Sequence, residues 1–197
     1  IEKTCLTKNL RANNGLLRVL DYVRKGGDIS HYEPEPDEPV SVMVSACDGF
    51  FDKDKLIKNN VSHIVYRNKT RIDITKRIRN DLNKNPVKGE PIVYRGATID
   101  TEISKICKNE VGVFDGLMGQ WDHHKQTVKG AHFDEYSDGY CYLQYGYAIT
   151  AHTAQGSSYD NVIVHVDDIP TFIDKETRRK WVYTAVSRAR KSISIIY

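Results

Sequence analysis

Polar groups that can bind phosphate and sugar are concentrated between residues 146 and 157. The segment reads Gly-Tyr-Ala-Ile-Thr-Ala-His-Thr-Ala-Gln-Gly-Ser, and it offers hydroxyl groups, an imidazole and an amide. Such groups position a nucleic-acid strand through its backbone without reading its sequence. A glycine also lets a backbone N–H approach a phosphate closely. The residues that carry these groups are Thr150, His152, Thr153, Gln155, Gly156 and Ser157.

Helix capping is the alternative role for two of these hydroxyl groups. Thr150 and Ser157 lie at the ends of residues 149–156, where we expect a short helix. Hydroxyl oxygens of Ser and Thr commonly accept hydrogen bonds from N–H groups at helix ends and in turns. The sequence therefore leaves both capping and phosphate binding open for these two residues.

Charge is distributed unevenly along the 197 residues, although the net charge is only +3. Residues 28–54 carry eight acidic side chains against one lysine, whereas residues 67–88 carry eight basic side chains against two acidic ones. Residues 175–191 repeat the basic bias. Two basic segments can form a surface that attracts phosphate. On charge alone, however, solvated helix faces are the simpler interpretation.

Length and composition exclude several classes of protein. A chain of this length forms one large domain, or one domain with a smaller insert, and buries a core without disulfides. The apolar runs are too short for a transmembrane helix and the chain does not begin like a secretory signal, so we expect no membrane partner. The chain starts at Ile1 without Met, and we expect a fragment of a longer protein.

The cysteines and histidines do not form a recognisable metal site. The four cysteines form no C-x-x-C pair, and reduced thiols in a cytoplasmic protein are their expected state. His123, His124 and His132 lie near Asp122, but paired Cys/His spacing is missing from this polar, loop-like stretch. We therefore predict no metal ligands here. The cysteines are Cys5, Cys47, Cys107 and Cys141.

Helix and strand patterns alternate over residues 13–83 and again over residues 149–197. This alternation is typical of a parallel sheet covered by helices. Residues 84–146 differ, because short runs rich in Gly, Asp and Tyr predict a small antiparallel β insert. The expected strands are 40–46, 61–66, 161–166 and 192–197, and the expected helices are 14–25, 50–59, 70–83, 149–156 and 176–189.

Two segments together resemble motifs V and VI of superfamily 1 helicases, close to the RecD-like and Dda-like branch that moves 5′ to 3′. They are residues 146–164 and the run Tyr183-Thr-Ala-Val-Ser-Arg-Ala-Arg190. Upstream, Leu6-Thr-Lys-Asn-Leu-Arg11 resembles motif IV, and Tyr66-Arg-Asn-Lys-Thr70 resembles the segment that links motifs IV and V. The four segments occur in the expected order and span nearly the whole chain.

The resemblance implies a fold and a division of the chain. The fold is a second RecA-like motor domain, in which helices flank a parallel sheet, with a small antiparallel SH3-like β insert. Residues 1–85 and 145–197 would form the motor domain, and residues 86–144 would form the inserted subdomain.

The resemblance also implies roles for individual residues. Arg11 and Arg188 would stabilise negative charge on the γ-phosphate during ATP hydrolysis, because guanidinium groups are planar and always charged. A surface ion pair is the alternative for each arginine. Gly156 would lie with them at the nucleotide. The residues that would contact single-stranded DNA are Asn68, Thr150, His152, Thr153, Gln155, Ser157, Lys76 and Arg79.

Two positions depart from this simple assignment. The family often has Lys-Ser where this chain has Thr153-Ala154, and the lost positive charge argues against a direct phosphate contact at position 153. Arg190 is two residues from Arg188, so on a helix it faces elsewhere, and we assign it to the surface or to DNA.

The function that the resemblance implies is the C-terminal motor half of an ATP-dependent DNA helicase. The chain contains no G-x-x-x-x-G-K-[ST] phosphate loop. ATP and Mg²⁺ would therefore be bound mostly by an absent N-terminal RecA-like domain, and we expect the isolated chain to be inactive. The alternative is a stand-alone nucleic-acid-binding module without catalysis. A small-molecule α/β enzyme has no motif in its favour.

Overall fold

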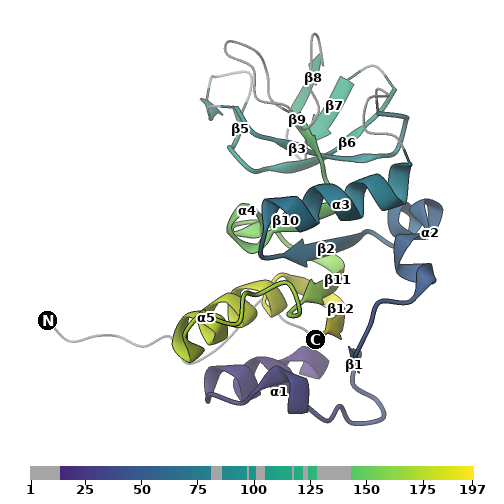
Figure 1. Cartoon of the computed structure of the whole chain (residues 1–197). Helices are drawn as coiled ribbons and strands as arrows, with labels where there is room; N and C mark the ends of the chain where they lie inside the picture. The colour runs from purple at the N-terminus through teal and green to yellow at the C-terminus, as the bar shows by residue number, and fades with distance from the viewer. Residues whose placement is uncertain are drawn as a thin grey trace, which may run out of the picture.

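The larger sheet is parallel and has five strands in the order β1-β12-β11-β2-β10 (Figure 1). The computed structural model describes residues 14–80, 86–96, 98–100, 105–116, 118–121, 124–127 and 143–197. The longest strands of this parallel sheet, β11 and β12, are neighbours at its centre. The strands are β1 (Val40–Met43), β2 (Val61–Val65), β10 (Ala148–Thr150), β11 (Tyr159–His165) and β12 (Ala189–Ile196).

Helices cover both faces of this sheet. Ile64 packs into the core beneath α1 (Asn14–Arg24) and α5 (Lys175–Val186), whereas its neighbour Val65 packs with α2 (Lys53–Lys58) and α3 (Asn68–Arg79). Successive side chains of a strand point to opposite faces, so one strand serves both cores. Figure 1 shows α3 and α5 on opposite sides of the sheet. The short helix α4 (Ala151–Ala154) follows β10 directly.

A second, antiparallel sheet is inserted between α3 and β10. Its strands have the order β8-β7-β6-β3-β9, and it projects beyond α3 in Figure 1. The predicted fold class, a helix-flanked parallel sheet with an antiparallel insert, is confirmed. The strands are β3 (Pro91–Tyr94), β6 (Val111–Phe114), β7 (Met118–Trp121), β8 (His124–Thr127) and β9 (Leu143–Tyr145), and β4 (Ile99–Asp100) pairs separately with β5 (Lys105–Ile106).

The sequence misplaces several element boundaries. The helix expected over 50–59 is a 3₁₀ turn, η2 (Asp48–Phe51), followed by α2, because the Asp52 side chain accepts a hydrogen bond from Lys55 N at 3.1 Å and begins a new helix. The helix expected over 149–156 is shortened to α4, because Ile149 and Thr150 pair with β2. The helix expected over 70–83 begins earlier, at Asn68, and ends at Arg79, because Asn80 adopts a left-handed φ of +61° and caps the helix.

The two chain crossings between the parallel sheet and the insert lie side by side. Gly146 N, after β9, donates a hydrogen bond to the carbonyl oxygen of Pro91, at the start of β3, at 2.7 Å. A Cβ atom at position 146 would lie 3.0 Å from Pro91 Cβ and 3.1 Å from its carbonyl carbon. The close approach of the two strands therefore needs a glycine at this crossing.

A buried carboxylate, Glu90, joins both crossings to the helices on one face of the parallel sheet. It accepts hydrogen bonds from Arg79 Nε at 2.8 Å, Val87 N at 2.7 Å and Tyr147 OH at 3.0 Å, and Lys53 Nζ lies 2.6 Å away. Burial by itself raises the pKa of Glu90, but the bonds from Arg79, Lys53 and Val87 hold it below its ordinary value. The ionised carboxylate is thus the form that the fold stabilises.

We predict that Glu90→Gln lowers the free energy of unfolding by about 3 kcal/mol or more, because it leaves two buried or half-buried cations without their counter-charge. Urea unfolding of the isolated chain at pH 7 measures this. The matched control is Glu176→Gln, which removes an exposed pair with Lys180 and should leave the free energy of unfolding nearly unchanged.

The same comparison has a defined pH dependence. A carboxyl group with a lowered folded-state pKa contributes its stability above the unfolded pKa and loses it as pH falls through the folded pKa. The unfolding free energies of wild type and Glu90→Gln should therefore converge as the solution is acidified below pH 4.5. Parallel curves would contradict the assigned ionised state of Glu90.

Among the described residues, no helix combines the length and apolar character that crossing a bilayer requires.

Candidate functional site

The site is built around α4 and the strand that precedes it. Thr150 ends β10 and caps α4: its Oγ1 accepts a hydrogen bond from Thr153 N at 3.3 Å and lies 2.9 Å from Thr153 Oγ1. Thr153 is only 6% exposed, and its hydroxyl faces inward. His152, between them, is exposed. The expected capping role of Thr150 is therefore confirmed, and the residue remains partly exposed.

The loop after α4 presents its backbone to the surface. Gly156 has a φ of +101°, and a Cβ atom built there would meet nothing within 4 Å. The left-handed φ favours glycine, and the open space allows a ligand to approach the backbone. Gln155 and Gly156 are exposed, whereas Ser157 is half-buried and its N–H bonds to Ala154 O at 3.1 Å.

A groove separates this loop from the antiparallel insert. We call it the insert groove; its volume is about 710 Å³. Three predicted site residues, Gln155, Gly156 and Ser157, line it together with Arg190. Lys108 and Asn109 line it from the turn between β5 and β6. Amide, hydroxyl and cationic groups thus meet in one hollow between the two sheets, a combination that suits phosphate and sugar.

Arg188 is fixed behind the same loop. It follows the end of α5 and donates hydrogen bonds to Thr184 O at 3.1 Å, Ser157 O at 3.3 Å and Ser187 Oγ at 2.9 Å. These three contacts orient the guanidinium next to the loop. The half-buried Arg188 is therefore joined to the loop that carries Gly156.

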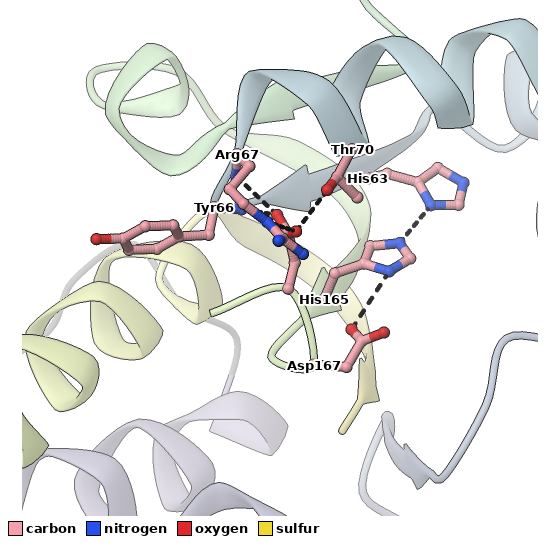
Figure 2. A network of polar contacts seen from close by, with 7 residues as sticks. His63, Tyr66, Arg67, Thr70, His165 and Asp167 are labelled. Atoms are coloured by element: carbon pink, nitrogen blue, oxygen red, sulfur yellow. Dashed lines mark hydrogen bonds and ion pairs between the residues drawn. The ribbon is translucent and has the colours of Figure 1, made fainter. Parts of the chain in front are cut away.

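The first turn of α3 is held by a buried aspartate from another strand. Asp168, just beyond β11, accepts hydrogen bonds from Tyr66 N and Arg67 N at 2.7 Å and from Arg67 Nε at 2.6 Å, and Thr70 Oγ1 also donates to it (Figure 2). A carboxylate at a helix N-terminus satisfies otherwise unpaired N–H groups and the positive end of the helix dipole. This contact fixes the exposed residue Asn68.

Asn68 and Thr150 share one edge of the parallel sheet. β2 and β10 are adjacent parallel strands, and Thr150 pairs with Val65, the last residue of β2. Both strands therefore deliver their next residues to the same edge. We call the exposed Asn68 and His152 and the partly exposed Thr150 the strand-end edge; the insert groove forms a second cluster.

The two predicted DNA-binding cations of α3 have different environments. Lys76 is exposed. The Arg79 side chain is only 4% exposed, pairs with Glu90, and stacks over the Tyr145 ring at 3.9 Å from its centroid. The surface position that the sequence predicts for Arg79 is wrong, because the insert covers this end of α3, and we remove Arg79 from the proposed DNA contacts.

The buried histidine pair of Figure 2 is structural. His63 Nδ1 lies 2.9 Å from His165 Nε2, and His63 Nε2 lies 2.8 Å from the carbonyl oxygen of Phe50. Burial, together with the neighbouring His165, lowers the pKa of His63 to about 3. A neutral, enclosed imidazole does not contact a ligand at the surface.

Several predicted residues fall outside the described part of the chain. Arg11 and the whole Leu6–Arg11 segment lie there, as do Asp122, His123 and His132. Conversely, the sequence does not point to Asp168 or to Arg95 of the insert, which contacts Thr153. An aspartate just after a buried strand was a usable signal for Asp168; no local pattern marks Arg95.

Comparison with known proteins places this architecture. Residues 145–196 match the UvrD-like helicase C-terminal domain family. A crystal structure of Pif1 helicase from Bacteroides, in complex with ADP-AlF3 and ssDNA, aligns with 96% of this chain and 51% of its own at a TM-score of 0.56 and 17% identity. Pif1 helicase from Candida albicans aligns with 93% of this chain and 53% of its own at a TM-score of 0.51 and 12% identity.

Curated relatives of the sequence are uncharacterized proteins. One from Methanocaldococcus jannaschii is 32% identical over 121 residues, which are 52% of this chain and 10% of that protein. One from Acanthamoeba polyphaga mimivirus is 28% identical over 148 residues, which are 71% of this chain and 25% of that protein. The chain thus spans a minor part of these relatives and about half of the aligned Pif1 chains.

Residues 145–196 thus resemble the C-terminal domain of UvrD-like helicases, and the described residues share the fold of the corresponding half of the Pif1 helicases. The resemblance drawn from the sequence motifs is confirmed at this level. Among helicases of known structure, the described residues share their fold with the Pif1 helicases.

We predict that Asp168→Asn lowers the free energy of unfolding by about 2 kcal/mol, since the amide loses one acceptor oxygen and the charge that binds Arg67. The neighbouring change Asp167→Asn affects a side chain that is 50% exposed and should cost less than half as much. Urea unfolding of the isolated chain measures both. Equal effects would mean that the four-fold contact of Asp168 does not fix α3.

Proposed function

We propose that this chain is the C-terminal motor half of an ATP-dependent DNA helicase. The observation that carries the proposal is the family match over residues 145–196, which contain Thr150, Gly156 and Arg188 in one connected site. The division into a motor domain of residues 1–85 and 145–197 and an insert of residues 86–144 is part of this proposal. ATP hydrolysis drives translocation along single-stranded DNA.

The nucleotide side of the proposed site is Gly156 with Arg188, and Arg11 completes it. Bound ATP supplies the phosphoryl group, with Mg²⁺ held mainly by the N-terminal RecA-like domain. The residues fit this role, because the Gly156 backbone is open to a phosphate and the Arg188 guanidinium is held next to the same loop by its bond to Ser157 O. Arg188 stabilises charge on the phosphate oxygens in the transition state.

The DNA side consists of the strand-end edge and the insert groove. Asn68, Thr150 and His152 offer hydrogen bonds to phosphate and sugar, and Gln155, Ser157 and Arg190 line the groove. Lys76 adds a positive charge on α3. Thr153 acts indirectly, because its buried hydroxyl faces Thr150 and Arg95. These contacts hold the strand without reading its sequence.

The two sides are coupled through a very short connection. Only α4 separates Thr150 from the Gly156 loop, and Arg188 bonds to Ser157 O in that loop. A movement of Arg188 towards a phosphate therefore pulls on the loop and on α4. Domain closure of this kind converts hydrolysis into stepping when the two states differ in their affinity for DNA.

Steady-state ATP hydrolysis by the full-length protein, with and without single-stranded DNA, tests the proposal. DNA should stimulate turnover, and Arg188→Ala should lower the stimulated kcat by roughly 10³-fold, by analogy with arginine fingers. Arg18→Ala, which removes the ion pair between α1 and Glu38, is the control and should leave kcat unchanged. Full turnover in Arg188→Ala would remove Arg188 from the nucleotide site.

The isolated chain separates the two candidate functions. It should show no ATP turnover of its own, because it contains no phosphate-loop motif. DNA binding without turnover in the full-length protein as well would favour the nucleic-acid-binding module. DNA-stimulated turnover in the isolated chain would contradict its role as half of a motor.

Lys76→Gln should weaken binding of single-stranded DNA and reduce the slope of log K against log salt by about 0.7, the contribution of one phosphate contact. Lys180→Gln is the matched control, since Lys180 lies on α5, across the sheet, and pairs with Glu176. Fluorescence titrations of the full-length protein at several salt concentrations measure both slopes. If Lys76→Gln had the same salt slope as Lys180→Gln, Lys76 would not contact a phosphate and this face of α3 would be an ordinary solvated surface.

A further inference from the structure

Arg95 reaches from the insert to α4. It directly follows β3, and its NH1 donates a hydrogen bond to Thr153 Oγ1 at 2.9 Å and another to Asn109 Oδ1. Asn109 is held in turn, because its N–H bonds to Tyr94 O at 2.7 Å and its φ is +70°. The guanidinium is therefore fixed by the insert and bonded to the buried hydroxyl of Thr153 on α4.

This contact determines the direction of a hydrogen-bond chain. A guanidinium only donates, so Thr153 Oγ1 accepts from Arg95 and keeps one hydrogen to give. Thr153 is 6% exposed, and a buried hydroxyl hydrogen needs an acceptor. Thr150 Oγ1, 2.9 Å away, is the acceptor in reach. The chain thus runs from Arg95 through Thr153 to Thr150.

The consequence falls on Thr150. Its Oγ1 accepts from Thr153 Oγ1 and from Thr153 N, which occupies both of its acceptor positions. Its own hydrogen then has to point away from α4. Thr150 is half-buried at the strand-end edge, so this hydrogen points to the surface, where a negatively charged oxygen can accept it.

We propose that Arg95 is a positioning residue: it orients the Thr153–Thr150 hydroxyl pair so that Thr150 donates to a phosphate of single-stranded DNA. This deepens the proposed function and rests on it. It also gives the insert a part in DNA binding that does not require Arg95 to touch DNA. If the insert withdraws from α4, Thr153 Oγ1 loses the hydrogen bond from Arg95. Thr150 can then donate its hydrogen to Thr153 Oγ1 instead, and the donor at the surface is lost.

Two neutral substitutions of similar size separate positioning from charge. Arg95→Gln retains an N–H donor for Thr153, whereas Arg95→Met does not, and both remove the positive charge. The affinity of the full-length protein for an oligothymidylate is measured without nucleotide at several salt concentrations. Arg95→Met should bind about five-fold more weakly, the effect of one hydrogen bond. Arg95→Gln should bind within two-fold of wild type, with both salt slopes unchanged.

Thr153→Val supplies the second half of the test, since it removes the accepting hydroxyl at nearly constant volume. It should weaken binding about as much as Arg95→Met, and the double variant should bind no more weakly than either single one, because both break the same chain. Thr153→Ser should restore affinity. Thermal unfolding of each variant, with Tm close to that of wild type, identifies those that retain the fold.

Each other outcome contradicts the proposal. Equal weakening by Gln and Met, with slopes lowered by about 0.7, would mean that Arg95 contacts a phosphate directly. Additive losses in the double variant, or no loss in Arg95→Met, would mean that Arg95 does not orient the hydroxyl pair. If wild-type protein itself fails to bind DNA, the proposed function fails along with this inference.

Discussion

The buried Glu90 carboxylate is the interaction on which the arrangement of the two sheets depends. An ionised group removed from water is tolerated only when it is paired and hydrogen-bonded. Glu90 meets that condition with groups from α2, α3 and both chain crossings, namely Lys53, Arg79, Val87 and Tyr147. The insert therefore leaves the parallel sheet at a fixed place, and the position of the groove between the insert and the loop after α4 follows from it.

The candidate site is compact because a single short helix connects its parts. Thr150 caps α4 at one end, and the Gly156 loop follows at the other, where Ser157 O accepts from Arg188. Proposed nucleotide and DNA contacts are thus separated by one helical turn and one loop. Arg95 of the insert also bonds to Thr153 of α4. The helix is therefore held both by the parallel sheet, through the Thr150 cap, and by the insert.

Local sequence patterns predict most of the fold and part of the candidate site. Alternation of helix and strand signals predicted the parallel sheet, and frequent Gly and Tyr predicted the antiparallel insert, because periodicity and turn residues act within a few positions. Element ends were less accurate: Asp52 divides one expected helix, and strand pairing takes Ile149 and Thr150 out of another. The 146–157 segment and the Arg188 region were found from short motifs.

The sequence by itself determined the class of fold, the helicase-type motifs and the polar segment around Thr150 and Gly156, since these depend on neighbouring residues. Only the tertiary structure decided which charged side chains are paired inside the protein and which remain exposed at the surface. Arg79 is buried by a partner 11 positions away, Arg95 meets Thr153 across 58 positions, and Arg67 meets Asp168 across 101. Burial and pairing of charges depend on distant segments that folding brings together, and no local pattern encodes that proximity.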